Sequence, residues 1–179
     1  IVFEDADIEA AVMGTVSGIF AATGQTCIAG SRLLVQRSIQ EKFTARLLDV
    51  AKEAKIGDPM SADTNIGPVT TPPQFKKVME YIDIAKQEGA NCILGGKPYT
   101  GPGSAGSQFV EPTIFTDVTN DMRIAQEEVF GPVLSIIPFD TEEEAIAIGN
   151  DVVFGLAAGV WTSNIGRALR MSEKLRAGT

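Results

Sequence analysis

The chain has 179 residues, of which 44% are hydrophobic and 21% are charged, a composition typical of one globular domain. Its 23 acidic and 15 basic residues give a net charge of −8, which repels nucleic-acid phosphates and anionic membrane surfaces. We therefore expect no nucleic-acid partner, and the lack of a long apolar run predicts no membrane partner. Two widely separated cysteines and no histidine argue against a disulfide framework and a metal site, and they fit a reducing, cytoplasmic setting.

The first predicted element is a helix over residues 4–22, because apolar residues recur there at helical spacing behind an acidic start. A turn bracketed by Gly24 and Gly30 follows, and both glycines are expected to act as backbone hinges. The apolar run "SRLLVQR" over residues 31–37 then predicts a strand.

Ser38 is expected to cap a second helix over residues 38–55, with Glu41 completing a capping box. The segment 56–73 is punctuated by glycine and proline and predicts a long surface loop. Its two final prolines introduce a third helix over residues 74–90, since proline is favoured in the first helical turn. Two amphipathic helices are thus expected after the first strand.

The middle of the chain contains three strand-like runs and one glycine-rich segment. Strands are expected over residues 91–96, 109–115 and 133–139, because these runs are apolar and rich in β-branched or aromatic residues. Cys92 belongs to the first run, so we expect it to be a structural residue. The segment 97–108 predicts a flexible hairpin or lid, since its glycines lack the strand and helix context of a phosphate loop.

The last part of the chain is predicted to contain two capped helices around a strand. Thr141 begins a helix over residues 141–150, and Asn164 begins another over residues 165–178. Between them, "LAAGVW" over residues 156–161 predicts a strand. The alternation of helices with apolar strands indicates an α/β fold, which we expect to be a three-layer α/β/α arrangement around a mostly parallel sheet.

No linker or internal repeat divides the sequence, so residues 1–179 are expected to form one domain. The chain begins at Ile1 without an initiator methionine and stops within "LRAGT". We therefore expect a fragment that is truncated at both ends.

Cys27 lies in the stretch "GQTCIAGSR", a glycine-bracketed turn where a core thiol is not expected. A lone cysteine is most often a small buried apolar residue. Here the polar neighbours Gln25 and Thr26 and the flexible backbone favour an accessible thiol that can act as a nucleophile. Because the chain has no histidine, activation of the thiol is left to backbone N–H dipoles, to Arg32 or a lysine, or to a carboxylate acting through water.

The second candidate constellation is "AQEEVFGPVLSIIPF", where Glu127 and Glu128 precede a Gly-Pro turn and a buried strand. A solvated, structural acidic pair is the simpler interpretation. In a functional interpretation, one carboxylate accepts hydrogen bonds from a sugar diol and Phe130 offers a flat apolar face to a ring. The third stretch, "NDVVFGLAAGVWT", is by itself a turn glycine entering a core strand.

Together these stretches resemble those of the aldehyde dehydrogenase superfamily. "GQTCIAGSR" is similar to its active-site cysteine segment, and "EEVFGPV" to its cofactor-ribose segment. "FGLAAGVWT" followed by "LRAG" resembles a downstream landmark, with Phe154 where tyrosine is more common. "IGDPMSADTNIGPV" and the opening "IVFEDADIEAAV" resemble two further recurrent stretches. All of them follow in the superfamily's order, and the resemblance covers essentially the whole chain.

The resemblance implies an NAD(P)-dependent oxidation of a small-molecule aldehyde to a carboxylic acid. Cys27 would attack the aldehyde to form a thiohemiacetal, hydride would pass to the nicotinamide, and water would hydrolyse the resulting thioester. Glu128 would bind the nicotinamide ribose, Phe130 would contact the nicotinamide end, and the backbone N–H of Cys27 would be one oxyanion donor. Thr26 and Ile28 would line the aldehyde pocket. The resemblance leaves open which aldehyde is used and whether the cofactor is NAD or NADP.

The superfamily's Rossmann-like cofactor domain, its glutamate general base and an oligomerisation strand are expected outside this chain. The isolated chain is therefore expected to be inactive, and the full-length protein to be a homo-oligomer. Three alternatives stay open: an acylating enzyme that resolves the thioester with coenzyme A or phosphate, a non-catalytic member of the superfamily, and a cofactor-free thiol hydrolase, which the lack of histidine disfavours. Every catalytic interpretation expects the Cys27 sulfur at the carboxyl-terminal mouth of the sheet, close to Glu128.

Overall fold

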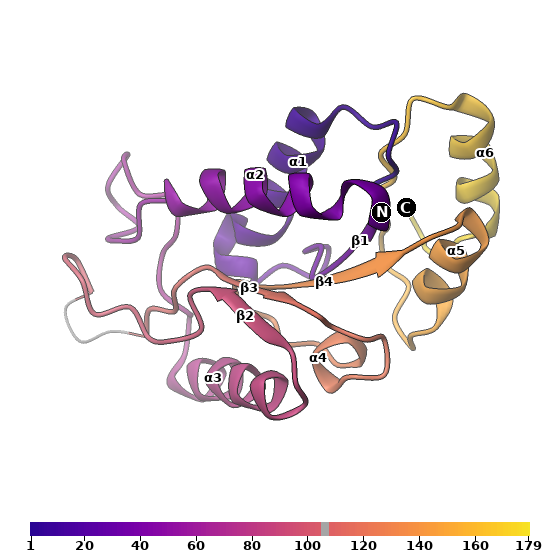
Figure 1. Cartoon of the computed structure of the whole chain (residues 1–179). Helices are drawn as coiled ribbons and strands as arrows, with labels where there is room; N and C mark the ends of the chain where they lie inside the picture. The colour runs from indigo at the N-terminus through magenta and orange to yellow at the C-terminus, as the bar shows by residue number, and fades with distance from the viewer. Residues whose placement is uncertain (105–107) are drawn as a thin grey trace.

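The computed structural model describes residues 1–104 and 108–179, and Figure 1 shows the path of the chain. The elements in chain order are α1 (Ile8–Phe20), η1 (Ala21–Gly24), β1 (Arg32–Gln36), η2 (Arg37–Ile39), α2 (Gln40–Lys52), α3 (Pro72–Gln87), β2 (Asn91–Leu94), β3 (Thr113–Thr116), α4 (Arg123–Gln126), β4 (Val133–Phe139), α5 (Glu142–Asn150) and α6 (Ile165–Lys174), where η1 and η2 are 3-10 helices. Groups of one or two α-helices therefore alternate with groups of one or two strands along the chain.

The four strands form one sheet in the order β1-β4-β3-β2. β1 pairs with β4 and β4 pairs with β3 in parallel, whereas β2 lies antiparallel to β3 at the edge. In Figure 1, α1 and α2 cover one face of this sheet, and α3 and α4 lie on the other face. The prediction of a three-layer α/β/α fold with a mostly parallel sheet is therefore confirmed.

Side chains of β4 alternate between two apolar clusters, one on each face of the sheet. Ile137 and Phe139 belong to the cluster that includes the buried residues of α3. Leu134 and Ile136 belong to the cluster that includes those of α1 and α2. A strand buried on both faces needs apolar residues at odd and even positions, which explains the nearly continuous apolar run of β4.

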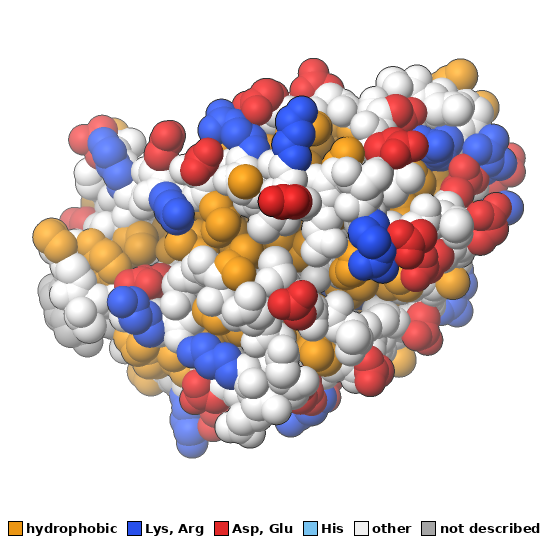
Figure 2. All heavy atoms as spheres, viewed as in Figure 1, with side chains coloured by type: hydrophobic (Ala, Val, Ile, Leu, Met, Phe, Trp, Pro, Cys, Tyr) orange, Lys and Arg blue, Asp and Glu red, His pale blue; other side chains and the backbone are white. Residues whose placement is uncertain are grey.

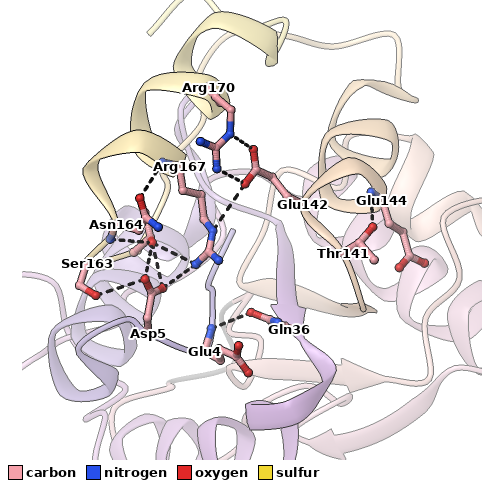
Figure 3. Close-up of polar contacts among 11 residues, drawn as sticks. Glu4, Asp5, Gln36, Thr141, Glu142, Glu144, Ser163, Asn164, Arg167 and Arg170 are labelled. Carbon is pink, nitrogen blue, oxygen red and sulfur yellow. Dashed lines mark hydrogen bonds and ion pairs between the residues drawn. The ribbon is translucent and has the colours of Figure 1, made fainter.

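Two of the predicted helix starts are confirmed by side-chain caps (Figure 3). Thr141 Oγ1 accepts a hydrogen bond from the N–H of Glu144, and Asn164 Oδ1 accepts one from the N–H of Arg167, both at 3.1 Å.

The expected cap at Ser38 is wrong. Its hydroxyl donates to Glu4 Oε2 at 2.8 Å, and the 3-10 turn η2 precedes α2. A carboxylate from a distant segment engages this hydroxyl, and the local spacing of residues does not reveal such a contact.

The predicted strand over residues 156–161 is present only at its end, as a short strand-like pairing. Residues 153–159 are exposed, and in this stretch only Trp161 forms a strand-like bridge, with Val2. Residues 159–161 run beside residues 1–3, which pair in turn with β1: the N–H of Trp161 donates to the carbonyl of Ile1 at 2.9 Å, and the N–H of Phe3 donates to the carbonyl of Trp161 at 3.0 Å. The glycine and alanine residues before them have little apolar surface to bury and form no strand. Residues 155–158 lie along the C-terminal residues, where the N–H of Gly178 donates to the carbonyl of Gly155 at 2.9 Å.

The glycine-rich segment 97–108 has arms that pair as in a hairpin. Pro98 and Val110 form an antiparallel bridge, and the N–H of Tyr99 donates to the carbonyl of Phe109 at 3.0 Å. Residues 105–107, where part of the predicted hairpin or lid falls, lie outside the described residues.

Charged side chains of both signs are distributed over the surface. On the face shown in Figure 2, Asp and Glu side chains are interspersed with Lys and Arg, so the excess of acid does not gather in one patch there. Within residues 1–104 and 108–179, no helix is long and apolar enough to cross a membrane.

Candidate active site

Two segments that precede neighbouring strands meet at one edge of the sheet. The cysteine turn (residues 25–31) leads into β1, and the glutamate segment (residues 127–132) leads into β4. Because β1 and β4 are parallel neighbours, both segments lie at the amino-terminal ends of their strands. The expected placement at the carboxyl-terminal mouth of the sheet is therefore wrong, since both segments come before their strands in the chain.

The cysteine turn presents the Cys27 thiol to solvent. The N–H of Ala29 donates to the carbonyl of Thr26 at 3.1 Å, which closes a tight turn around Cys27. The N–H of Gly30 donates to the carbonyl of Gly18 at 3.0 Å. The last turn of α1 therefore holds one side of the cysteine turn in place.

A close approach of two glycines brings the segments together. Gly24 has a φ of +68°, and a Cβ added there would lie 2.1 Å from the carbonyl oxygen of Gly131. Any larger residue at position 24 would push the cysteine turn away from the glutamate segment. Gly30 has no left-handed φ, and an added Cβ would meet no atom within 4 Å, so the hinge expected there is not required.

Cys92 differs from Cys27 in its surroundings. It is half-buried in β2, and its Sγ donates to the carbonyl of Leu94 at 3.3 Å. Burial raises the pKa of the Cys92 thiol, although the charge of Lys86 opposes this shift. These features are those of a packed thiol and not of a nucleophile.

A cavity of about 350 Å³ is lined by both segments, and this volume is sufficient for part of a small-molecule ligand. The five site residues predicted from the sequence all line it: Thr26, Cys27, Ile28, Glu128 and Phe130. Phe154 also lines it, from the irregular segment after α5. The wall of the cavity therefore combines residues that lie far apart in the sequence: Cys27 and Phe154 are separated by 127 positions.

The two adjacent glutamates have different surroundings. Glu127 accepts hydrogen bonds from Arg123 Nε and Nη2 at 2.8 and 2.9 Å, and from the Tyr81 hydroxyl. The bonds from Arg123, followed by that from Tyr81, lower the pKa of Glu127 to about 2. No described residue forms a hydrogen bond or ion pair with the Glu128 carboxylate, which lines the cavity. Glu128 is therefore the carboxylate of the pair that is available to a ligand.

Phe130 has a left-handed backbone conformation, with a φ of 57°, which a bulky residue rarely adopts. Gln74 Nε2 donates to the carbonyls of Val129 and Phe130 at 2.9 and 3.0 Å, and these bonds hold the glutamate segment in this shape. Gln74 lies in the first turn of α3. The sequence pattern does not reveal its role, because a glutamine just after a helix cap resembles any surface residue.

Arg32, one of the candidate activators of the thiol, is engaged with other groups. Its guanidinium donates to Asn120 Oδ1 and, at 2.6 Å, to the carbonyl of Ile148, and so ties the start of β1 to two neighbouring segments. Burial lowers the pKa of Arg32, and the charge of Asp151 opposes this shift. The other activators considered from the sequence stay open.

Comparison with known proteins relates the whole chain to one family. The model of the aldehyde dehydrogenase family matches residues 1–179. A betaine aldehyde dehydrogenase from Mesorhizobium japonicum is 49% identical over 100% of this chain and 37% of its own length. An aldehyde dehydrogenase from Emericella nidulans is also 49% identical, over 100% of this chain and 35% of its own length. The chain thus spans little more than a third of the curated relatives it matches.

Solved structures show the same relationship. A betaine aldehyde dehydrogenase from Staphylococcus aureus in complex with NAD+ is 45% identical, with a TM-score of 0.97 over 99% of this chain and 35% of that chain. An NAD-dependent aldehyde dehydrogenase from Sinorhizobium meliloti is 43% identical, with a TM-score of 0.95 over 99% of this chain and 34% of that chain. The fold described above is therefore shared with these proteins over nearly every residue.

Proposed function

The chain belongs to the aldehyde dehydrogenase family, and we propose that it is the part of such an enzyme that carries the nucleophile. The proposed reaction is the oxidation of an aldehyde to a carboxylic acid with NAD or NADP. One observation carries this proposal: the exposed Cys27 thiol and the Glu128 carboxylate, which no described residue binds, line the same cavity. Both side chains are exposed, and their position on one cavity wall supports a shared role in chemistry.

Cys27 supplies the nucleophile in the proposed reaction. Its thiolate adds to the carbonyl carbon of the aldehyde, so that a C–S bond forms and the carbonyl electron pair moves onto oxygen. The backbone N–H of Cys27, by analogy with the family, stabilises that oxyanion. Loss of hydride from the same carbon then leaves a thioester. Attack by water breaks the C–S bond and releases the carboxylic acid and the thiol.

The residues around the cavity fit a nicotinamide cofactor, which supplies the hydride acceptor when it is bound. The Glu128 carboxylate can accept hydrogen bonds from a ribose diol, and the Phe130 ring offers an apolar surface. Gln74 supports this surface through its bond to the Phe130 carbonyl. NAD is the first cofactor to test because the staphylococcal relative was solved with NAD+, and NADP is the alternative.

Aldehyde-dependent formation of NADH tests the proposal. Betaine aldehyde is the first substrate to test, because a similar relative is a betaine aldehyde dehydrogenase. We expect the complete polypeptide that contains this chain to form NADH, and its Cys27→Ser variant to form it more slowly by a factor of about 10⁴ or more. We expect the 179-residue chain alone to be inactive, since the cofactor domain and general base of the family are expected outside it. Formation of NADH by the chain alone, at the rate of the complete enzyme, would contradict that part of the proposal.

Two outcomes would favour the alternatives. A requirement for coenzyme A or phosphate in product release would indicate an acylating enzyme. Equal labelling of Cys27 and Cys92 by an aldehyde-directed thiol reagent would favour a non-catalytic member of the family, because the proposed nucleophile should react faster than the half-buried thiol.

A further inference from the structure

The loop over residues 67–70, here called the clamp loop, overlaps the recurrent stretch "IGDPMSADTNIGPV", which the proposed mechanism does not use. We propose that the clamp loop positions the Cys27 sulfur, acting through the side chains of Thr23 and Gln25. Neither residue lines the cavity, so both are positioning residues and not catalytic ones. The effect on turnover rests on the proposed function, whereas the effect on the cysteine turn depends only on the fold.

The backbone before Cys27 has an unusual conformation. Ala22, Thr23 and Gly24 have φ values of 50°, 59° and 68°, so three consecutive residues are left-handed and two of them are not glycine. L residues with a Cβ avoid this region, and such a conformation persists only where surrounding contacts hold it. The cysteine turn therefore depends on residues outside itself.

Thr23 makes the first contact with the clamp loop. Its side chain is buried, with 3% of the residue exposed, and its Oγ1 donates to the carbonyl of Gly67 at 3.1 Å. A buried hydroxyl needs a hydrogen-bond partner, and the Gly67 carbonyl supplies it. The bond joins the left-handed run directly to the clamp loop.

Gln25 makes the second contact with the clamp loop. Its Oε1 accepts hydrogen bonds from the N–H and the hydroxyl of Thr70, at 2.9 and 2.8 Å. Its Nε2 donates to the carbonyl of Pro68 at 3.4 Å. Both the acceptor and the donor of the Gln25 amide group therefore form hydrogen bonds with the clamp loop. These bonds fix the position of Gln25.

The clamp loop contacts residues 22–25 from one side, and the glutamate segment contacts them from the other. Gly24, between Thr23 and Gln25, packs against the backbone of Gly131. The clamp loop, Thr23 and Gln25 carry no charged side chain. The proposed role of the clamp loop is therefore to set where the sulfur lies.

Hydrogen exchange of the complete polypeptide that contains this chain tests the role of the clamp loop without relying on turnover. In the Thr23→Val and Gln25→Ala variants, the amides of Ala29 and Gly30 should exchange about tenfold faster, while α2 and β4 keep the rates of the parent chain. Thr23→Ser, which keeps the hydroxyl, should restore the protection. Thr44→Val is the matched control and should change nothing in the cysteine turn, because the Thr44 hydroxyl is buried without a hydrogen-bond partner among the described residues.

Unchanged exchange at Ala29 and Gly30 in both variants would overturn the proposal. Equal acceleration in α2 and β4 would also overturn it, because Thr23 and Gln25 would then support general packing only. In the complete enzyme, both variants should lower kcat about tenfold and leave the KM for NAD unchanged, and a parental kcat would exclude the positioning role. A parent enzyme that oxidises no aldehyde would refute the proposed function alone, since the exchange result does not depend on turnover.

Discussion

The two edges of the parallel strands β1 and β4 use their charged side chains differently. At the carboxyl-terminal edge, four charged side chains bind one another (Figure 3): Asp5, Glu142, Arg167 and Arg170. At the amino-terminal edge, the Cys27 thiol is exposed, and no described residue binds the Glu128 carboxylate. Charges that are paired with one another serve the fold, whereas reactive groups left unpaired around a cavity are available for chemistry.

Arg167 makes several of the contacts in this cluster at the carboxyl-terminal edge. Its Nη1 lies 2.9 Å from Asp5 Oδ1, its Nε lies 3.6 Å from Glu142 Oε2, and its guanidinium lies 4.4 Å from the centre of the Phe3 ring. Arg170 adds two hydrogen bonds of 2.7 Å to Glu142, and these bonds lower the pKa of that carboxyl. The cluster joins α6 to α5 and to the N-terminal segment, so its role is structural.

The largest effect that sharpens this comparison is expected for Cys27→Ser. In the complete enzyme, loss of the thiolate should lower NADH formation by a factor of about 10⁴ or more, because the covalent route is removed. Cys92→Ser is the matched control and should keep activity within about twofold, since Cys92 does not line the cavity. Comparable losses in both variants would remove the distinction between the two thiols.

The next effect concerns stability and belongs to the carboxyl-terminal edge. Arg167→Met removes the shared partner of Asp5 and Glu142, and we expect it to lower the free energy of unfolding by about 1–2 kcal/mol. Urea denaturation measures this change. Arg46→Met is the control, because its pair with Glu9 is far more exposed and should contribute much less. An equal decrease in the free energy of unfolding in both variants would show that burial of the cluster does not increase its contribution to stability.

Glu128→Gln tests the amino-terminal edge directly. The amide keeps the size of the side chain and weakens its acceptance of hydrogen bonds from a ribose, so the KM for NAD should rise about tenfold. The free energy of unfolding should stay near that of the parent, because no described residue binds this carboxylate. Steady-state kinetics and urea denaturation of the same variant separate the two effects, and an unchanged KM with lower stability would reverse the assignment.

Local sequence patterns predict the elements better than they predict where those elements meet. The helix starts at Thr141 and Asn164 follow from residues within one turn, and β4 follows from an apolar run of strand length. The five cavity residues could be predicted because the family resemblance links distant motifs that no local pattern connects. The sequence did not predict the edge of the sheet at which these residues lie, because that edge depends on which strands are parallel neighbours.

Contacts between distant segments account for what the sequence did not reveal. Gln74 holds a backbone carbonyl 56 positions away, and Ser38 binds a carboxylate 34 positions away. Residues 159–161 find a backbone neighbour in residues 1–3, at the other end of the chain, whereas residues 156–158 have none in the sheet. None of these contacts can be predicted from the residues that are adjacent in the sequence.

The smallest expected effect is a pH dependence of stability from Glu127, on the same edge as the candidate site. Arg123, followed by Tyr81, lowers the pKa of this carboxyl from 4.5 to about 2, so its contribution to stability is present above pH 4.5 and is lost as the pH falls toward 2. Because the Glu127 side chain is 41% exposed, solvent screens the pair and the loss should stay under about 1 kcal/mol. Glu127→Gln and Arg123→Met should both flatten this acid limb in urea titrations between about pH 7 and about pH 3. If both variants kept the parental dependence of stability on pH, Arg123 and Tyr81 would not bind Glu127 as the structure shows. Glu127 would then not differ from Glu128 as a structural carboxylate differs from an available one.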